Sequence, residues 1–367
     1  MSLSPTLYAG AISGTSVDGL DLALLDTSGA TPRIVDARVE ALPETLAQEL
    51  RALAAGADDH LDRVARVDAE LGEFIGHAVR RFAGGRSVIA VGSHGQTIRH
   101  DPRGRPAYTV QIGDPSRIAE CSGIDTVADF RRRDIAAGGE GAPLVPPFHA
   151  ALLGVADTRR AVLNIGGIAN VTFLGDPALG HGPVTGFDTG PGNALLDAWI
   201  REHRGEPFDR DGAWSAGARA IPELLGRLEE DAFLAEQPPK STGKEHYNLA
   251  FILRHLEGSE AAARVQATLA EFTAASVAGA ISSWGPATAE VVVCGGGRWN
   301  ADLMRRLDRR LSPRSVTTTD ALGVDGDAVE AAAFAWLAYR FVERLPGNAP
   351  AVTGAAGPRV LGALYPA

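Results

Sequence analysis

The hydrophobic and polar positions of this chain follow strand-like and helix-like periods in an order that occurs twice. Near the start, apolar runs at 7–12 and 20–25 flank a turn-rich stretch at 13–19, which predicts a β-hairpin. The elements expected to follow are a strand at 34–41, helices at 44–54 and 61–82, and a short buried strand at 87–91. Strands separated by helices indicate a partly parallel sheet.

The second half repeats this order. An apolar run at 161–165, a tight Gly166-Gly167 turn and a run at 168–174 predict another hairpin. The later elements are a strand at 185–187, a helix at 191–203 with Pro191 in its first turn, a helix at 265–284, a strand at 290–294 and a helix at 301–311. The pattern predicts a duplicated α/β fold with a central mixed sheet in each half.

The domain boundaries follow from this repeat. We expect the first domain at 1–130, completed by a C-terminal helix at 327–345, and the second domain at 131–326. The stretch 204–248 is rich in Gly, Pro and charge, and is expected to form insertions at the edge of a cleft between the domains.

Composition removes several classes of protein. The 367 residues are 45% hydrophobic and 22% charged, which is typical of a globular protein. The net charge of −10, without a Lys/Arg-rich run, argues against nucleic-acid binding. No stretch resembles a signal peptide or a membrane span, so a cytoplasmic protein is expected. The two cysteines, Cys121 and Cys294, lack the spacing of a zinc site.

The lysines are unusually placed. Nearly every one of the 35 basic residues is arginine, and the lysines, Lys240 and Lys244, both fall in the segment 238–244. Arginine does not always replace a compact ammonium group, so the clustering suggests a chemical role for this segment. An ordinary solvated loop remains the alternative.

Three glycine-rich turns are candidate phosphate or nucleoside contacts. In the first hairpin turn, Gly14 and Gly19 permit close approach of the backbone to a polyphosphate, and Thr15 and Ser16 add donors. Asp18 could hold Mg²⁺ through its water shell. The others are the turn of 164–170 and the three glycines of 294–300. Each alone is equally explained as a plain turn; their occurrence in mirrored halves favours a nucleotide site.

Polar residues near predicted strand ends are candidate substrate contacts. Asp188 is expected at a strand end just before a helix, where a carboxylate suits a general base, although Asp is also favoured as a helix cap. The stretch Ser93-His94-Gly95-Gln96-Thr97 could bind sugar hydroxyls. Arg131 could hold a carboxylate by a two-point contact, or belong to a solvated Asp-paired run.

At these motifs the chain resembles the anhydro-N-acetylmuramic acid kinase family, over about residues 8 to 345. The resemblance implies two actin/ribonuclease-H-like domains with an active-site cleft between them, and Asp188 as the catalytic residue. It implies ATP binding by Gly14, Thr15, Ser16, Val17, Asp18, Gly19, Leu20, Asp21, Asn164, Gly166, Gly167, Asn170, Gly295, Gly296, Gly297 and Asn300. It implies sugar binding by His94, Gln96, Thr97, Arg131, Gly190 and Glu330. Departures are Ile12 in place of Met and Lys244 in place of a commoner Arg.

The family resemblance also implies a reaction. ATP, water and 1,6-anhydro-N-acetylmuramic acid would give N-acetylmuramic acid 6-phosphate and ADP in cell-wall recycling, with Mg²⁺ as cofactor. The expected partners are therefore ATP and an amino sugar, with no nucleic acid and no membrane, and a homodimer is left open. The alternatives are a kinase for another N-acetylhexosamine and a non-catalytic nucleotide-dependent binding module.

Overall fold

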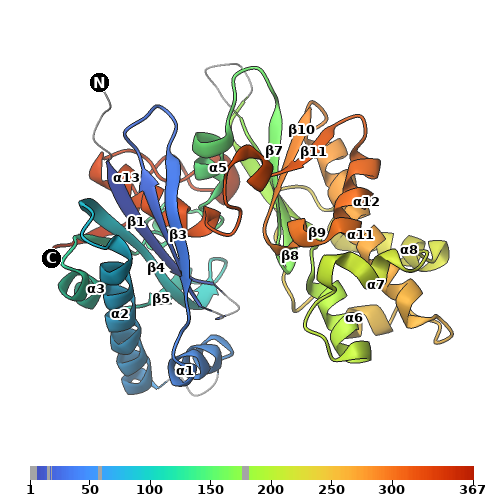
Figure 1. Ribbon diagram of the computed structural model, residues 1–367, viewed down its shortest axis with the longest axis horizontal. Helices are drawn as coiled ribbons and strands as arrows, with labels where there is room; N and C mark the ends of the chain where they lie inside the picture. The colour runs from blue at the N-terminus through green and yellow to red at the C-terminus, as the bar shows by residue number, and fades with distance from the viewer. Residues whose placement is uncertain (1–5, 15–16, 18, 57–59, 176–181) are drawn as a thin grey trace. The chain divides into compact units, whose positions relative to one another are not determined.

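Contacts divide the chain into two compact units, each described here by itself. The computed structural model describes residues 6–14, 17, 19–56, 60–175 and 182–367 (Figure 1). Unit 1 combines Met1–Leu153 with Ala328–Ala367, and unit 2 is Gly154–Asp327. The C-terminal segment therefore returns to the unit that contains the N-terminus.

Unit 1 is built on a mixed sheet. Its strands are β1 (Leu7–Ser13), β2 (Leu20–Asp26), β3 (Arg33–Glu40), β4 (Val88–Asp101), β5 (Tyr108–Ile112), β6 (Thr126–Ala128) and β12 (Ala363–Tyr365). The order across the sheet is β12-β6-β4-β1-β2-β3, and β5 pairs with β4. The first three strands form an antiparallel meander, whereas β4 runs parallel to β1 and β6 runs parallel to β4.

Helices cover both faces of this sheet because β1 is apolar on both sides. Ala9 and Ala11 belong to a core that includes Leu71 and Ile75 of α2, whereas Gly10 faces α13 on the opposite side (Figure 1). The helices of unit 1 are α1 (Glu44–Ala54), α2 (Leu61–Ala83), α3 (Pro115–Ser122), α4 (Arg132–Ala136), α5 (Pro146–Leu153), α13 (Val329–Val342) and α14 (Pro350–Thr353).

The sheet of unit 2 repeats the plan of the first. Its strands are β7 (Arg160–Ile165), β8 (Ile168–Phe173), β9 (Thr185–Pro191), β10 (Glu290–Cys294) and β11 (Ser315–Thr318), in the order β11-β10-β7-β8-β9. Again the first three strands form an antiparallel meander and the later two are parallel to the first of them. The duplicated α/β fold predicted from the sequence is therefore confirmed.

One long helix joins two cores of unit 2. The C-terminal part of α11 packs on the sheet through Val277 and Ile281, and its N-terminal part packs on smaller helices through Leu269 and Phe272. The helical elements of unit 2 are α6 (Ala194–Arg204), η2 (Arg210–Gly212), α7 (Ala213–Ala216), α8 (Pro222–Glu229), α9 (Ala232–Ala235), α10 (Leu249–Leu253), α11 (Ala262–Trp284), η3 (Gly296–Trp299), α12 (Ala301–Leu311) and η4 (Asp320–Leu322).

Three predicted boundaries were wrong. β4 continues from Val88 to Asp101 instead of ending at residue 91, so the His94–Thr97 stretch lies within a strand. β9 continues to Pro191, and α6 begins only at Ala194, so Pro191 does not start the helix. In each case cross-strand pairing with β5 or β8 extends a polar or glycine-rich stretch that has no strand-like apolar alternation of its own.

Candidate active site

Register across the second sheet brings Asp188 into line with two asparagines. Asn164 of β7 pairs with Asn170 of β8, and Asn170 pairs with Asp188 of β9. Paired residues in neighbouring antiparallel strands project on the same face, with Cβ atoms about 5 Å apart. Two predicted nucleotide ligands and the predicted base therefore form one polar row, which is half-buried along its length.

A bulge sets this alignment. The pairing of β8 with β9 shifts between Ala169, which faces Gly190, and Asn170, which faces Asp188, so Thr189 is the extra residue. Bulges re-aim side chains and are frequent beside functional sites. Thr189 turns inward, is buried, and donates its hydroxyl to Ala169 O at 3.1 Å. Asp188 was predicted at the end of a strand; it lies instead inside the edge strand β9, paired with Asn170 of β8 on one side and donating its N–H to Lys240 O at 3.2 Å on the other.

The surroundings of Asp188 suit a base that works near neutral pH. Burial raises the pKa of Asp188 to about 6, against the opposing effects of a hydrogen bond from Thr242 N and of the nearby charge of Lys240. The Thr242 N–H donates to Asp188 Oδ2 at 3.0 Å. One carboxylate oxygen is thus fixed, and the side chain is not a helix cap, because α6 begins six residues later in the chain.

The turn between β7 and β8 is fixed against the start of α6. β7 ends at Ile165 and β8 begins at Ile168, so the turn consists of Gly166 and Gly167, as the sequence predicts. Gly167 O accepts from Gly192 N at 2.9 Å and from Ala194 N at 3.0 Å, and Gly166 O accepts from Asn193 N at 2.8 Å. The carbonyl groups are therefore engaged on the side of the helix.

Lys244 lies against this turn. A Cβ added at Gly167 would come within 2.7 Å of Lys244 Cε and 3.6 Å of its Nζ. The side chain of Lys244 is exposed, so its ammonium group is available beside a predicted phosphate-binding turn. A side chain at position 167 would therefore displace the end of the flexible Lys244 side chain from the turn.

The third glycine segment forms one wall of a pocket within unit 2. This pocket has a volume of about 510 Å³, within the usual range for a small-molecule site. It is lined by Asn193, Leu196, Asp197, Phe208, Asp209, Arg210, Asp211, Gly296, Trp299 and Asn300. The predicted nucleotide ligands Gly296 and Asn300 thus open into the same space as the start of α6.

The pocket fits a nucleoside. A side chain at Gly296 would meet no atom within 4 Å, so the backbone is open to a ligand there. The rings of Phe208 and Trp299 are 48% and 60% exposed, and apolar faces of this kind are suited to stacking on a base. The glycines on either side of Gly296 face inward instead. A Cβ at Gly295 would lie 2.3 Å from Asn164 Oδ1, and a Cβ at Gly297 would lie 2.3 Å from Ile165 Cγ2.

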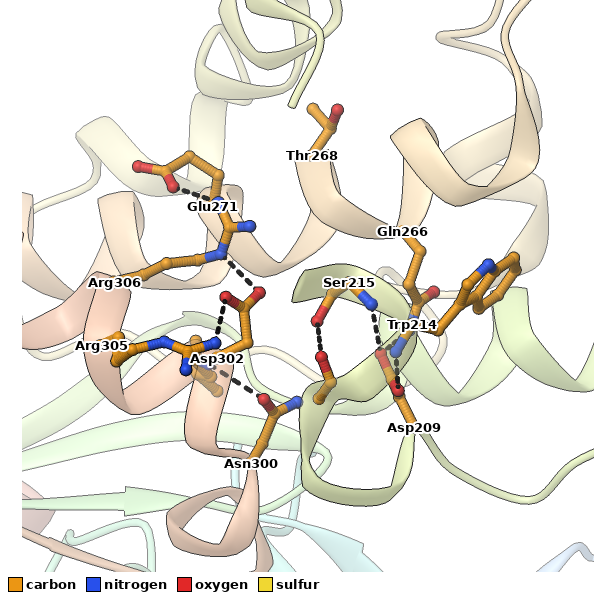
Figure 2. A network of polar contacts seen from close by, with 12 residues as sticks. Asp209, Trp214, Ser215, Gln266, Thr268, Glu271, Asn300, Asp302, Arg305 and Arg306 are labelled. Atoms are coloured by element: carbon orange, nitrogen blue, oxygen red, sulfur yellow. Dashed lines mark hydrogen bonds and ion pairs between the residues drawn. The ribbon is translucent and has the colours of Figure 1, made fainter. Parts of the chain in front are cut away.

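A network of polar contacts holds two walls of the pocket in place (Figure 2). Asp209 is buried and accepts from Trp214 N and Ser215 N, both at 2.9 Å, which shapes the loop before α7. On the other wall, Asn300 caps α12 through Leu303 N at 2.9 Å. Figure 2 shows Asp302 between these walls, bonded to Arg306 Nε at 2.8 Å.

Arg306 in turn carries the network to α11, where its Nη1 donates to Glu271 at 2.5 Å. Glu271 also accepts from Arg309 and Arg310. Burial opposes ionisation of Glu271, but the guanidinium groups of Arg310 and Arg306 outweigh it and lower the pKa. Partly buried networks of this kind are stronger than isolated surface pairs. The pocket is therefore lined by rigidly supported residues rather than by a free loop.

In unit 1, the first glycine loop is tied to the predicted sugar-binding stretch. The Gln96 amide, turned so that its nitrogen faces acceptors, donates to Ser13 Oγ at 2.7 Å and Gly14 O at 3.1 Å. Gly14 O also accepts from Val17 N at 3.0 Å, and Val17 has a positive φ of 54°. Thr15, Ser16 and Asp18, predicted to bind phosphate and Mg²⁺, lie outside the described residues.

The other residues of this loop lie where it enters β2. Gly19 meets Val39, because a Cβ at Gly19 would lie 2.8 Å from Val39 Cγ1. Leu20 is fully buried in the core and Asp21 is half-buried on the same strand. The predicted role of Leu20 in nucleotide binding is therefore restricted to its backbone.

His94, Arg131 and Glu330 come together in unit 1. Arg131 Nε donates to His94 Nε2 at 3.0 Å, so the imidazole is neutral and its Nδ1 proton faces Gly95 O at 3.0 Å. Burial and the charge of Arg131 lower the pKa of His94 well below its usual value. Burial lowers the pKa of Arg131 to about 10, with Glu330 opposing the shift. Glu330, in the first turn of α13, has a raised pKa because surrounding protein atoms displace part of its hydration, and Arg131 opposes this.

The donors of Arg131 are partly in use. Besides the bond from Nε to His94, its Nη1 donates to Gly141 O at 2.8 Å. The two-point contact with a carboxylate remains a prediction. Because Nε is already bonded to His94, such a contact would be made by the Nη1–Nη2 end of the guanidinium group. Thr97, further along β4, accepts from Gln111 Nε2 at 3.1 Å.

Within residues 6–14, 17, 19–56, 60–175 and 182–367, no group of three or more His, Cys, Asp and Glu side chains could hold a metal ion. Mg²⁺ usually keeps several waters and binds proteins through one or two carboxylates together with substrate phosphates. Mg²⁺ binding near Asp18 stays a prediction, because Asp18 lies outside the described residues.

Sequence reasoning missed several residues of the site. Phe208, Arg210 and Trp299 line the pocket, and the backbone of Thr242 holds Asp188. The stretch 204–248 was interpreted only as an insertion, because its short helices are interrupted by Gly and Pro and give no continuous period. The concentration of lysines in 238–244 was the one local signal that pointed to it.

The two α/β units have the same strand order, and the second aligns an aspartate with a glycine-turned hairpin. This is the fold expected of actin- and hexokinase-like proteins. The model of the family described as anhydro-N-acetylmuramic acid kinase matches residues 6–367, and the chain belongs to this family.

Relatives agree over almost the full length. A protein from Pseudomonas paraeruginosa (strain DSM 24068 / PA7) that is named anhydro-N-acetylmuramic acid kinase is 50% identical to this chain. The match covers 98% of this chain and 99% of the relative. That of Xanthomonas axonopodis pv. citri (strain 306) is 49% identical over 98% of both chains. The one from Chromohalobacter salexigens is 46% identical, covering 98% of this chain and 99% of the relative. Among solved structures, a ROK family glucokinase from Streptomyces griseus in complex with glucose and AMPPNP gives a TM-score of 0.39 at 16% identity, covering 89% of this chain and 99% of that one.

None of the helices in the described residues combines the length and the apolar character needed to cross a bilayer.

Proposed function

We propose that this protein is an ATP-dependent kinase that opens 1,6-anhydro-N-acetylmuramic acid with water and phosphorylates O6, giving N-acetylmuramic acid 6-phosphate and ADP in cell-wall recycling. The observation that carries the proposal is the row Asp188, Asn170 and Asn164, which aligns a carboxylate of raised pKa with a glycine-turned hairpin. The names of the relatives supply the substrate.

The reaction needs one base on the protein. Water attacks C1 of the sugar as the C1–O6 bond breaks, and the electron pair of that bond leaves with O6. A glycosidase would protonate this leaving oxygen with a second carboxylic acid. Here O6 instead forms a bond to the γ-phosphorus and ADP departs, so the proton released by the attacking water is the one that must be taken up. Asp188 accepts it.

The other residues bind and orient the reactants. The backbone at Gly166, Gly167 and Gly296 permits close approach of the nucleotide, and the Lys244 ammonium group adds positive charge beside the turn. Mg²⁺ would be held by phosphate oxygens and by Asp18 through water, and would neutralise charge on the transferring phosphoryl group. Both ring nitrogens of the neutral His94 are engaged, one by Arg131 Nε and one by Gly95 O, so His94 orients Arg131, whose Nη1–Nη2 end can pair with the lactyl carboxylate.

Product analysis in ¹⁸O-labelled water tests this function. With the anhydro sugar and ATP, we expect one ¹⁸O atom at C1 of the product and a phosphate group on O6. Turnover of N-acetylmuramic acid or N-acetylglucosamine, with none of the anhydro sugar, would favour the ordinary hexosamine kinase instead. Tight ATP binding without transfer to any amino sugar would favour a nucleotide-dependent binding module.

The pKa of Asp188 predicts the acid limb of the activity profile. The base must be ionised to accept the proton of water, and its pKa is raised to about 6. We therefore expect kcat/KM for the anhydro sugar to be constant above this pH and to fall about tenfold for each pH unit below it. Initial rates between pH 4.5 and 8.5 would measure the limb. A profile that stays flat down to pH 4.5 would contradict the assignment.

A further inference from the structure

Lys240 is buried in unit 2, and its ammonium group is fully engaged. The residue is 6% exposed, and its Nζ donates to Phe233 O at 2.9 Å and to Leu234 O at 3.1 Å. It also lies 4.6 Å from the centre of the Phe233 ring. The two carbonyl groups belong to α9. Phe233 O also accepts from Glu236 N at 3.2 Å, so the lysine adds a second bond to that carbonyl and supplies a donor to Leu234 O at the helix end.

This geometry explains why lysine stands here in a chain that otherwise uses arginine. Burying a cation is costly unless it is paired or hydrogen-bonded. A compact ammonium group can direct separate protons to two carbonyls and a ring face, whereas the planar guanidinium fork has a fixed shape. Lys240 is therefore matched to its position by shape as well as by charge.

The backbone of the segment 240–242 is hydrogen-bonded to Asp188. Asp188 N donates to Lys240 O at 3.2 Å, and Thr242 N donates to Asp188 Oδ2 at 3.0 Å. The segment thus contacts both the main chain and the carboxylate of the base, two residues apart. Lys240 Nζ also lies 5.8 Å from the ring of Phe187, the neighbour of Asp188 in β9.

We propose that Lys240 is a positioning residue for the Asp188 base: its side chain anchors the segment 240–242 on α9, and the backbone of that segment fixes the Asp188 carboxylate. The inference rests on the proposed function and deepens it. Without the anchor, the Thr242 N–H would lose its fixed relation to the carboxylate oxygen, and the base would occupy several orientations.

Charge adds a second consequence that can be measured. The charged groups around Lys240 are Glu236, Asp231 and Asp188, and all three interact with its ammonium group. Asp231 is already bonded to His246 and Tyr247, which hold it in place. Because the charge of Lys240 lowers the pKa of Asp188 against the effect of burial, its removal leaves that pKa higher.

The test compares Lys240→Met with Lys240→Arg, and uses Arg254→Met as a matched control. Arg254 is an exposed cation over Phe251 at 4.6 Å, so its loss removes a charge and a ring contact of the same kind elsewhere in unit 2. We expect Lys240→Met to lower kcat by on the order of 10- to 10²-fold with unchanged ADP affinity, and to move the acid limb to higher pH. Arg254→Met should change neither kcat nor the position of the acid limb.

Lys240→Arg separates position from charge. It retains the cation but not the compact donor, so we expect a loss of kcat with the acid limb near its original pH. A kcat equal to that of the parent in Lys240→Arg would overturn the positioning role, and this holds even if Lys240→Met fails to fold. A loss of kcat in folded Lys240→Met without movement of the limb would also overturn the proposal, since a merely structural role predicts that result.

A titration that needs no substrate distinguishes this inference from the proposed function. Asp188 can be followed by ¹³C NMR of carboxyl-labelled protein, with Asp188→Asn to assign its signal. An unchanged Asp188 titration in Lys240→Met would overturn the inference alone. Absence of turnover of the anhydro sugar by the unmodified protein would overturn the proposed function. The titration would still show whether Lys240 and the segment 240–242 affect the Asp188 carboxyl group.

Discussion

Asp188→Asn is expected to lower kcat by on the order of 10²-fold or more while ADP affinity stays close to that of the parent protein. Asparagine has nearly the same shape, and its side-chain oxygen can still accept from Thr242 N, but it cannot accept the proton of the attacking water. Steady-state kinetics with the anhydro sugar, together with calorimetric titration of ADP, would measure both quantities. A kcat within a factor of three of the parent would remove Asp188 from its role.

Asp188→Asn is expected to lose activity without losing stability at neutral and alkaline pH. Folding raises the pKa of Asp188 from 3.8 to about 6, so the folded state favours the protonated carboxyl group. This contribution to stability is present below the unfolded pKa and is lost as pH rises towards 6. Above that pH the carboxylate destabilises the fold, and Asp188→Asn should be at least as stable as the parent. Thermal unfolding at pH 8 would check this, and a marked fall in Tm would show that Asp188 is structural.

Gly92→Ala is expected to destabilise unit 1 by about 3 kcal/mol or more. Gly92 of β4 and Gly10 of β1 are paired, and both lie directly beneath α13. A Cβ at Gly92 would lie 1.9 Å from Phe334 O, and one at Gly10 would lie 1.8 Å from Ala331 O. Because the colliding atoms are backbone, no change of rotamer relieves the overlap, and α13 must move.

Denaturant unfolding of Gly92→Ala would be compared with that of Gly279→Ala. Gly279 is exposed in α11, and an added Cβ there meets nothing within 4 Å. The control should be more stable by roughly 0.5–1 kcal/mol, because alanine is the better helix former. Since α13 carries Glu330, any folded Gly92→Ala protein should also have a raised KM for the sugar. A Gly92→Ala protein as stable as the parent would contradict the packing argument.

Sequence reasoning succeeded where structure is encoded locally. The first hairpin, α1 (Glu44–Ala54) and β10 (Glu290–Cys294) were placed within a residue or two, because each has a clear apolar period bounded by turn residues. The repetition of this order also predicted the duplicated fold, and the motifs predicted the family. The predicted roles of individual residues, including Arg131 and Asp18, stay predictions.

The sequence by itself determined the order of the elements and the two glycine-turned hairpins, because periodicity and turn chemistry act over a few residues. It also singled out Asp188 as the predicted base. Only the tertiary structure decided that Asp188 lies within β9, level with Asn170, and that Lys240 and Thr242 hold it. The register and bulge between β8 and β9, and the hydrogen bond from Thr242 N to Asp188, join residues up to 54 positions apart in the sequence. Such pairings are selected by packing of the whole unit, and no local pattern along the chain specifies them.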